Sequence, residues 1–251
     1  MKKFFKKYWK FLLFVLIGSL IGGYFGGIWL YGTLSEDYLL QLKEQNITRD
    51  LFIVIMTIQY GIIYGALLAG FGVFFSEKVN LWKEFKFEKK AVITTLIITI
   101  IGALVLFPGD KLIFGSFSSF VKEQYVVAPD YASIIAGVLL GGIVEEVMMR
   151  LFLMSIFVFI FSQFLKNKKE IPVKFYIIAN IICALLFAVG HIPSTMAMTT
   201  LTPLLVVRCL LFNGTLGLGF GYLYRKYGIG YAMIAHGFAH LIADILMIIF
   251  I

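Results

Sequence analysis

The sequence predicts an all-α protein, a polytopic transmembrane helical bundle of about seven to eight membrane helices with a polar site buried in its C-terminal half. Of its 251 residues, 61% are hydrophobic and only 14% are charged, and the mean hydropathy is +0.94. These values lie far from those of a soluble domain. The hydrophobic residues gather into runs of about 20, the length that spans a hydrocarbon core of about 30 Å at about 1.5 Å per residue. We therefore expect an integral membrane protein.

Seven apolar runs follow one another along the chain: about 11–32, 51–75, 91–107, 131–165, 175–199, 201–224 and 231–251. The first run follows a basic arm, as in a signal peptide, but it is too long for a cleaved signal and is predicted to be a retained helix. The fourth run is too long for a simple crossing, so it is expected to tilt, protrude or break at Gly141 and Gly142. Residues 111–124 are expected to form an interfacial or re-entrant piece, which would be an eighth membrane element. No internal repeat is evident, so residues 1–251 are predicted to form a single membrane domain.

The lysine and arginine residues alternate between the two sides of the predicted membrane. Sixteen of the 22 lie in the N-terminal arm and in the second, fourth and sixth connections, and four lie in the other connections. Because cytoplasmic loops hold most Lys and Arg, this pattern predicts a multi-pass cell-membrane protein with a cytoplasmic N-terminus and an external C-terminus. The net charge of +8 thus reflects topology in a lipid bilayer, and no nucleic-acid partner is expected.

Eight ionisable side chains lie within or at the end of apolar runs instead of in connections. They are Glu145, Glu146, Arg150, His191, Arg208, His236, His240 and Asp244. An ionisable group at mid-bilayer costs about 2.5–3.5 kcal/mol on insertion scales, so such groups usually face one another or a water-filled cavity. We therefore expect these side chains to converge on one shared polar site.

Helical geometry groups most of these residues into two polar stripes. Glu146 and Arg150 are four residues apart and project from one helix face, with the acid first, which is the favourable order for an ion pair. Glu145 is rotated by about 100° from Glu146, so one carboxylate can pair with Arg150 while the other faces elsewhere. The second stripe repeats at the same spacing on the last helix and consists of His236, His240 and Asp244.

A buried set of glutamate and histidine residues is suited to the activation of water. A carboxylate whose pKa is raised by burial can act as a general base, and imidazoles can orient the water or stabilise an oxyanion. The residues that other intramembrane protease mechanisms require are missing. The chain has no H-E-x-x-H for a zincin-type mechanism, one intramembrane Asp where an aspartyl mechanism needs two, and no Gly-flanked Ser with a paired His for a serine-type mechanism. The sequence therefore favours hydrolysis by an activated water molecule.

Three motifs occur in order in the predicted membrane helices: E-E-x-x-x-R at 145–150, F-x-x-x-H at 187–191, and a histidine followed four residues later by a polar residue at 236–240. This set resembles the signature of the CPBP intramembrane proteases, the CAAX prenyl protease type 2 and bacteriocin-processing, or Abi, family. The resemblance covers residues 131–248, which would be a CAAX-protease-like catalytic core. It implies an intramembrane endopeptidase that cleaves a membrane-associated peptide or a lipid-modified protein.

The resemblance also implies a role for each residue of the motifs. Glu145 would be the general base that activates a water molecule, and His191 would share that water. Glu146 and Arg150 would hold the base in place. His236 and the residue four positions later would stabilise the oxyanion.

The third motif departs from the family pattern. Family members usually have Asn or Asp four residues after the histidine, whereas this chain has His240 in that position. An alternative register, His240 with Asp244, restores the usual pair. Family members are described as metal-dependent or as metal-independent, and a divalent metal such as zinc is an open alternative here. The histidine pair would then bind it together with His191 and a glutamate; no other cofactor is implied.

Two other functions are compatible with the same residues. Buried Glu, His and Arg side chains also build proton relays, so a proton-coupled membrane transporter is one alternative. The chain lacks the inverted repeats that are typical of transporters, which counts against it. A non-catalytic bacteriocin-immunity membrane protein that keeps the fold is the other alternative.

Overall fold

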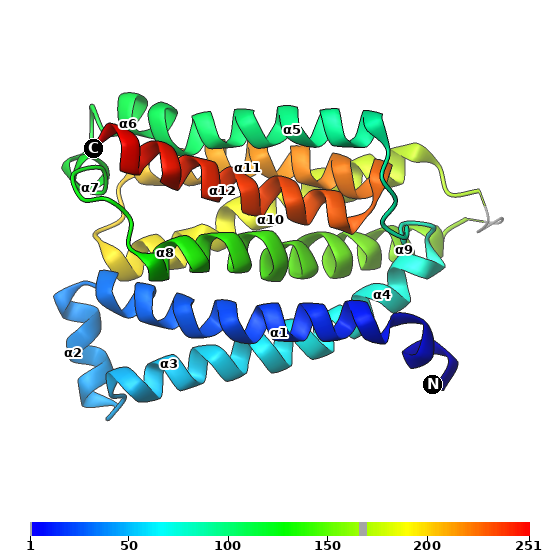
Figure 1. The fold of residues 1–251 in the computed structure, drawn as a ribbon, viewed down its shortest axis with the longest axis horizontal. Helices are drawn as coiled ribbons and strands as arrows, with labels where there is room; N and C mark the ends of the chain where they lie inside the picture. Colours follow the sequence, from blue (N-terminus) through cyan, green and yellow to red (C-terminus); the bar gives the residue numbers. More distant parts are fainter. Residues whose placement is uncertain (1, 166–169) are drawn as a thin grey trace.

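The computed structural model describes residues 2–165 and 170–251, and these residues form a helical bundle without strands (Figure 1). The predicted all-α class is therefore confirmed. The long helices run along one axis, with connecting loops at both ends of the bundle. Lys166, Lys168 and Lys169 of the fourth connection lie outside the described residues.

In chain order the helical segments of the described residues are α1 (Lys2–Thr33), α2 (Glu36–Glu44), α3 (Arg49–Ile58), η1 (Gln59–Leu68), α4 (Ala69–Lys78), α5 (Lys89–Leu104), η2 (Val105–Gly109), α6 (Asp110–Ile113), α7 (Ser119–Glu123), α8 (Tyr131–Ala136), η3 (Gly137–Glu145), η4 (Val147–Met154), α9 (Ser155–Ser162), α10 (Val173–Met198), α11 (Pro203–Tyr227) and α12 (Ile229–Phe250). The η segments are π-helical, a wider form of helix. Adjoining segments form continuous rods from α3 to α4, from α5 to α6 and from α8 to α9.

Among the described residues, six helices are long and apolar enough to cross a membrane: Lys3–Thr33, Arg49–Lys78, Lys89–Ile113, Val173–Met198, Pro203–Tyr227 and Ile229–Phe250. The rod over residues 131–162, here named the central rod, also runs the length of the bundle, although it carries the two glutamates and the arginine of the first motif. The chain is therefore a multi-pass membrane protein. The count of seven to eight crossings stays a prediction.

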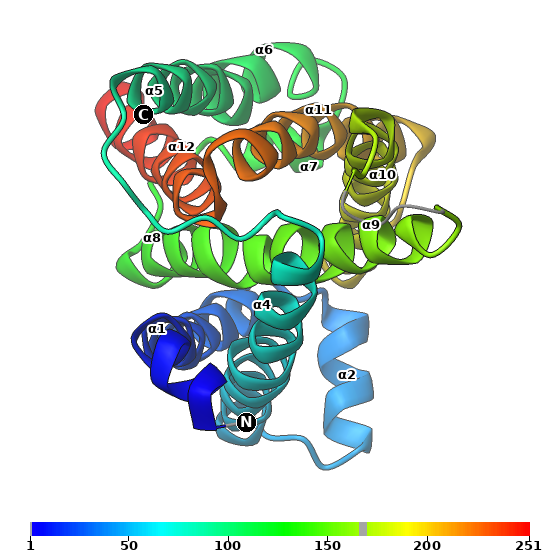
Figure 2. The same cartoon turned by 90° about the vertical axis from the view of Figure 1, so that its right-hand side faces the viewer.

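The central rod has helices on both of its sides (Figure 2). α1 and the rod from α3 to α4 cover one side, and α10, α11 and α12 cover the other. α5 packs outside α11 and α12. The first motif, which lies on the central rod, can thus meet side chains from both halves of the chain.

Glycine residues let the central rod approach α1 and α12 closely, as small residues commonly do between membrane helices. A Cβ atom at Gly22 of α1 would lie 3.0 Å from Cβ of Leu139, and one at Gly142 would lie 3.0 Å from Cα of Gly237 in α12. A break at Gly141 and Gly142 was one of three outcomes expected for this overlong run, and it is wrong. The rod continues through these residues as π-helix because both glycines pack against α12.

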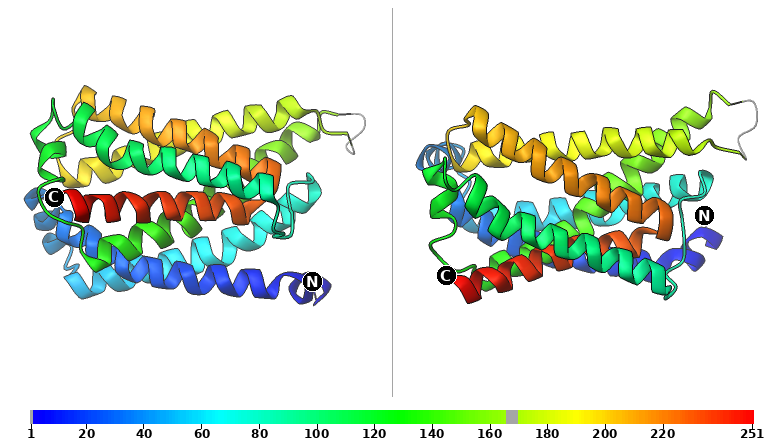
Figure 3. Two further views of the ribbon diagram at one scale, coloured as in Figure 1. Left: turned by 45° about the horizontal axis from the view of Figure 1, so that its top comes forward. Right: turned by 90° about the horizontal axis from the view of Figure 1, so that it is seen from above.

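The two ends of the bundle differ in the segments that they contain (Figure 3). The start of α1, the loop over residues 79–88 and the junction of α11 with α12 lie at one end. α2, α6, α7 and the C-terminus lie at the other end. Residues 111–124, predicted to be interfacial or re-entrant, thus form short helices at an end of the bundle. This grouping agrees with the alternation of basic connections, and the cytoplasmic side stays a prediction.

The loop over residues 79–88 holds the junction between α11 and α12. Lys83 Nζ donates hydrogen bonds of 2.8 and 2.7 Å to the carbonyl oxygens of Arg225 and Lys226, which the end of α11 leaves without helical partners. Gly228 then turns the chain with a φ of +102°, a conformation that favours glycine. Burial, followed by the charges of Lys226 and Arg225, lowers the pKa of Lys83. The helix that carries the third motif is thereby fixed at its first turn.

Candidate active site

Glu146 and Arg150 form a buried ion pair in the central rod. Arg150 Nη1 lies 3.0 Å from Oε1 of Glu146, and the two side chains are 1% and 0% exposed. Arg150 Nη2 also donates a hydrogen bond of 3.0 Å to the carbonyl oxygen of Gly217 in α11. The guanidinium lies over the rings of Phe187 and Phe220, at 4.7 and 5.5 Å from their centroids. The predicted pair is therefore present, and it ties the central rod to α10 and α11.

His236 connects α12 to both glutamates of the first motif. Its Nδ1 lies 2.8 Å from Oε1 of Glu146, and its Nε2 lies 3.6 Å from Oε2 of Glu145. The imidazole is buried and stacks on Phe220, with centroids 4.3 Å apart and an interplanar angle of 18°. An ionised carboxylate only accepts hydrogen bonds, so a neutral imidazole between the two glutamates can donate to one of them, and Nδ1 has the shorter contact.

The two adjacent glutamates have unequal surroundings. The side chain of Glu146 is fully buried between Arg150 and His236, whereas 27% of the Glu145 side chain is exposed. No hydrogen bond fixes the Glu145 carboxylate within the described residues. Glu145 is therefore the more exposed carboxylate of the pair.

His240 lies one turn beyond His236, and the two rings stack with centroids 5.3 Å apart. Gly141 makes room for both rings, because a Cβ atom there would lie 2.9 Å from His240 Cδ2 and 3.1 Å from His236 Nε2. In the part of the chain that the structure describes, Asp244 has no hydrogen bond or ion pair. The geometry thus favours the register of His236 with His240 over that of His240 with Asp244.

His191 approaches the same region from α10. Its Nδ1 lies 2.8 Å from the carbonyl oxygen of Phe187, one turn earlier, and its ring packs edge-on against the Phe187 ring at 4.7 Å. The same Phe187 ring packs edge-on against His236 of α12, with centroids 5.8 Å apart. No hydrogen bond between described residues links it to Glu145. The three motifs are therefore brought together, with His191 as the outermost member.

The region that contains these side chains matches a known family. Residues 128–242 match the family model described as type II CAAX prenyl endopeptidase Rce1-like. The chain has an Rce1-like domain. This confirms the family that the three motifs predicted, and it supports an intramembrane endopeptidase that acts on protein substrates. No curated protein and no solved structure matches the chain.

Arg208 is not joined to the Rce1-like site, so the expectation of one shared polar site is wrong for this residue. Arg208 Nε donates to Oδ1 and Oδ2 of Asp110 at 2.7 and 3.0 Å, and its Nη2 also contacts Oδ2. Tyr125 Oη donates to the same carboxylate at 2.6 Å. Asp110 is buried at the start of α6, although the sequence placed it in a connection. A Pro-Gly pair normally marks a turn, so Pro108 and Gly109 led to the prediction that the helix ends before Asp110.

The described residues of the Rce1-like domain do not fit a metal site. Among them no group of three or more His, Cys, Asp or Glu side chains is placed to hold a metal ion. Protein zinc sites require three or four such side chains around one point. Both ring nitrogens of His236 instead face carboxylates of the central rod.

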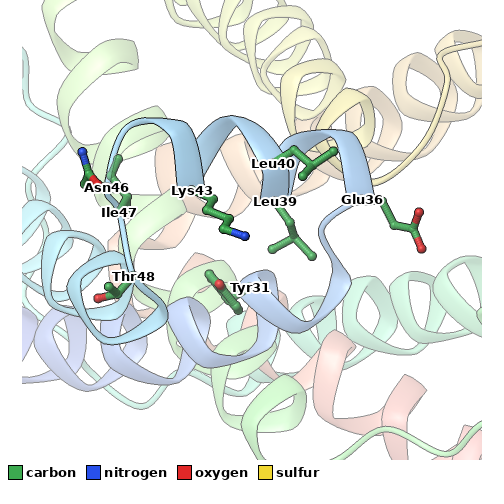
Figure 4. Close-up of a pocket in the computed structure, with 8 residues that line it drawn as sticks. All are labelled: Tyr31, Glu36, Leu39, Leu40, Lys43, Asn46, Ile47 and Thr48. Atoms are coloured by element: carbon green, nitrogen blue, oxygen red, sulfur yellow. The ribbon is translucent and has the colours of Figure 1, made fainter.

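A surface pocket of about 680 Å³ lies between the end of α1, α2 and the connection to α3 (Figure 4). It is lined by Tyr31, Glu36, Leu39, Leu40, Lys43, Asn46, Ile47 and Thr48. None of these residues belongs to the three motifs or to the Rce1-like domain. The pocket is therefore separate from the candidate active site.

Proposed function

We propose that this protein is an intramembrane endopeptidase in which Glu145 activates a water molecule for hydrolysis of a peptide bond. The observation that carries this proposal is the unequal environment of the two glutamates. Glu146 is fully buried and paired with Arg150, whereas the Glu145 side chain is 27% exposed. A general base needs access to both the water and the peptide, and the partial exposure of Glu145 supports this role.

The reaction would begin with transfer of a proton from water to Glu145. The hydroxide attacks the carbonyl carbon of the peptide bond, and the carbonyl oxygen takes the negative charge of the tetrahedral intermediate. Protonated Glu145 then returns the proton to the leaving nitrogen as the C–N bond breaks. His191 on α10 is the residue that would orient the water.

The oxyanion would be stabilised from α12. When Nδ1 of His236 donates to Glu146, its Nε2 carries no proton and cannot donate to an oxyanion. His240 stacks on His236 and packs over the same glycine, Gly141. We therefore assign the oxyanion donor to His240, with His236 as the residue that positions the two glutamates.

The family description suggests a class of substrate. A C-a-a-X sequence is a C-terminal signal in which the cysteine becomes prenylated. The Rce1-like domain is described as a CAAX prenyl endopeptidase type. We propose that a lipid-modified peptide or protein C-terminus is the substrate and that it reaches the site from the bilayer.

Cleavage assays in proteoliposomes test this function. The purified protein would be mixed with a quenched C-a-a-X peptide in farnesylated and unmodified forms, beside Glu145→Gln, His191→Ala and Glu123→Gln, an exposed control. We expect preference for the farnesylated peptide, full activity in the control and a loss of at least about 100-fold in Glu145→Gln. Equal cleavage by Glu145→Gln and the unmodified protein would overturn the proposal. Proton-coupled flux across the proteoliposome membrane without peptide cleavage would favour the alternative function of a membrane transporter.

A further inference from the structure

The second membrane rod, which lies outside the Rce1-like domain, also packs against the candidate site. Its π-helical part, η1, contacts η3 and η4 of the central rod. Tyr60 and Tyr64 of η1 are one turn apart, and their rings lie 5.3 Å apart at an interplanar angle of 32°. Both side chains are half-buried. The N-terminal half thus brings a pair of tyrosines to the rod that carries Glu145.

Tyr60 is the member of this pair that packs against α1 and lies within electrostatic range of Glu145. Gly23 of α1 leaves room for η1, because a Cβ atom there would lie 3.0 Å from Cβ of Tyr60. Tyr60 interacts electrostatically with Glu145. Its hydroxyl group has no hydrogen-bond partner within the residues that the structure describes. A half-buried hydroxyl group in a membrane helix is unfavourable without a partner, and a bound substrate would supply one.

We propose that Tyr60 is a substrate-binding residue whose hydroxyl group donates a hydrogen bond to a backbone carbonyl oxygen of the peptide held beside Glu145. This inference rests on the proposed hydrolytic function. An extended peptide in the hydrocarbon region has backbone N–H and C=O groups that cannot form hydrogen bonds with water. A hydrogen-bond donor in the wall of the site therefore stabilises the bound peptide. Tyrosine combines an apolar ring with a polar tip and suits such a wall. Part of the specificity would then lie outside residues 128–242.

Tyr60→Phe tests the proposal, with Tyr64→Phe as a matched control that removes the same group one turn away. Initial rates would be measured in proteoliposomes with the quenched farnesylated C-a-a-X peptide. We expect Tyr60→Phe to raise KM by about fivefold to tenfold, the effect of one lost hydrogen bond, with kcat within about twofold. Tyr64→Phe should leave both constants within about twofold of the starting values. An unchanged KM in Tyr60→Phe, or an equal rise in both variants, overturns the proposal.

A binding measurement separates this role from folding and from catalysis. A fluorescent farnesylated peptide would be titrated against Glu145→Gln and against Glu145→Gln combined with Tyr60→Phe, after thermal melting has shown that both are folded. Binding should be weaker in the double variant by about fivefold to tenfold. Equal binding would refute the role of Tyr60 while leaving the function intact if Glu145→Gln is inactive. Cleavage by Glu145→Gln at the normal rate would instead refute the function, and this inference with it.

Discussion

His236 Nδ1 forms a hydrogen bond of 2.8 Å with Oε1 of Glu146, the same oxygen that lies 3.0 Å from Nη1 of Arg150. An imidazole of α12 and a guanidinium of the central rod therefore both lie against one buried carboxylate oxygen. Oε2 of Glu146 has no hydrogen-bond partner in the described residues. A charged carboxylate in the membrane interior thus depends on these two partners.

Replacement of Arg150 by alanine should strongly destabilise the protein. The change leaves Glu146 as an unpaired buried charge, which typically costs about 3–5 kcal/mol. Arg150→Lys keeps the charge but loses the planar fork that reaches Glu146 and Gly217 together, so it should be intermediate. Thermal melting in detergent measures both effects, with the exposed Arg49→Ala as control. Equal melting temperatures for the two alanine variants would contradict this prediction.

If the third motif consists of His236 and His240, substitutions at His240 and at Asp244 should have different effects on kcat. His240→Ala should lower kcat by about 100-fold, the usual effect of removing an oxyanion donor. Asp244→Asn should leave kcat within about twofold, because Asp244 has no hydrogen bond or ion pair with the described residues. His240→Asn keeps a donor and should fall between these variants. Steady-state kinetics that show the greater loss in Asp244→Asn would favour the other register.

Gly141 should be intolerant of any side chain. An added Cβ atom would lie 2.9 Å from His240 Cδ2, so Gly141→Ala must displace the histidine pair and lower cleavage. Gly70→Ala is the matched control, since nothing lies within 4 Å of its added Cβ atom. Alanine is favoured over glycine in a helix by about 1 kcal/mol, so the control should be active and no less stable. Normal kcat in Gly141→Ala would argue against packed histidines at the site.

Removal of divalent metals should leave cleavage unchanged. The described His and acidic side chains form no group of three or more around a common point. The protein would be dialysed against EDTA, its metal content measured by mass spectrometry, and its rate compared with that of the undialysed sample. Loss of activity that zinc restores would show that these side chains rearrange around a metal during catalysis.

The pH dependence of stability should include a contribution from Lys83. Its pKa is lowered in the folded protein by burial and by Lys226 and Arg225, so the folded protein releases this proton at a lower pH than the unfolded chain. Keeping Lys83 charged in the folded protein therefore lowers the free energy of unfolding. This loss of stability is fully present below the lowered pKa and decreases as the pH rises towards the ordinary value of 10.5. The melting temperature should therefore rise with alkaline pH relative to Lys83→Met. A constant difference between the two proteins would contradict this.

The membrane rods and the first ion pair were predictable because they depend on local periodicity. Apolar runs of about 20 residues indicate membrane helices whatever their neighbours are. The spacing of Glu146 and Arg150 places both side chains on one face of a helix, so their pairing required no tertiary information.

Contacts between helices were predictable only in part. Arg208 was grouped with the other ionisable side chains because it lies in an apolar run, yet it pairs with Asp110. A position within an apolar run does not determine which way a helix face points. Gly141 and Phe220, which pack against His236, carry no local signal of that contact. Both were therefore found only in the folded protein.

By itself, the sequence determined that the chain is a helical membrane protein with three ordered polar motifs of the Rce1-like type. Only the tertiary structure decided that Glu145 is the more exposed carboxylate, that His236 lies between the two glutamates, and that η1 from the other half of the chain packs against the rod that carries them. The physical reason is that lipid tails are as apolar as the helix surfaces. Hydrophobicity therefore places a helix in the membrane, while close packing and polar contacts decide which of its faces meets a neighbour.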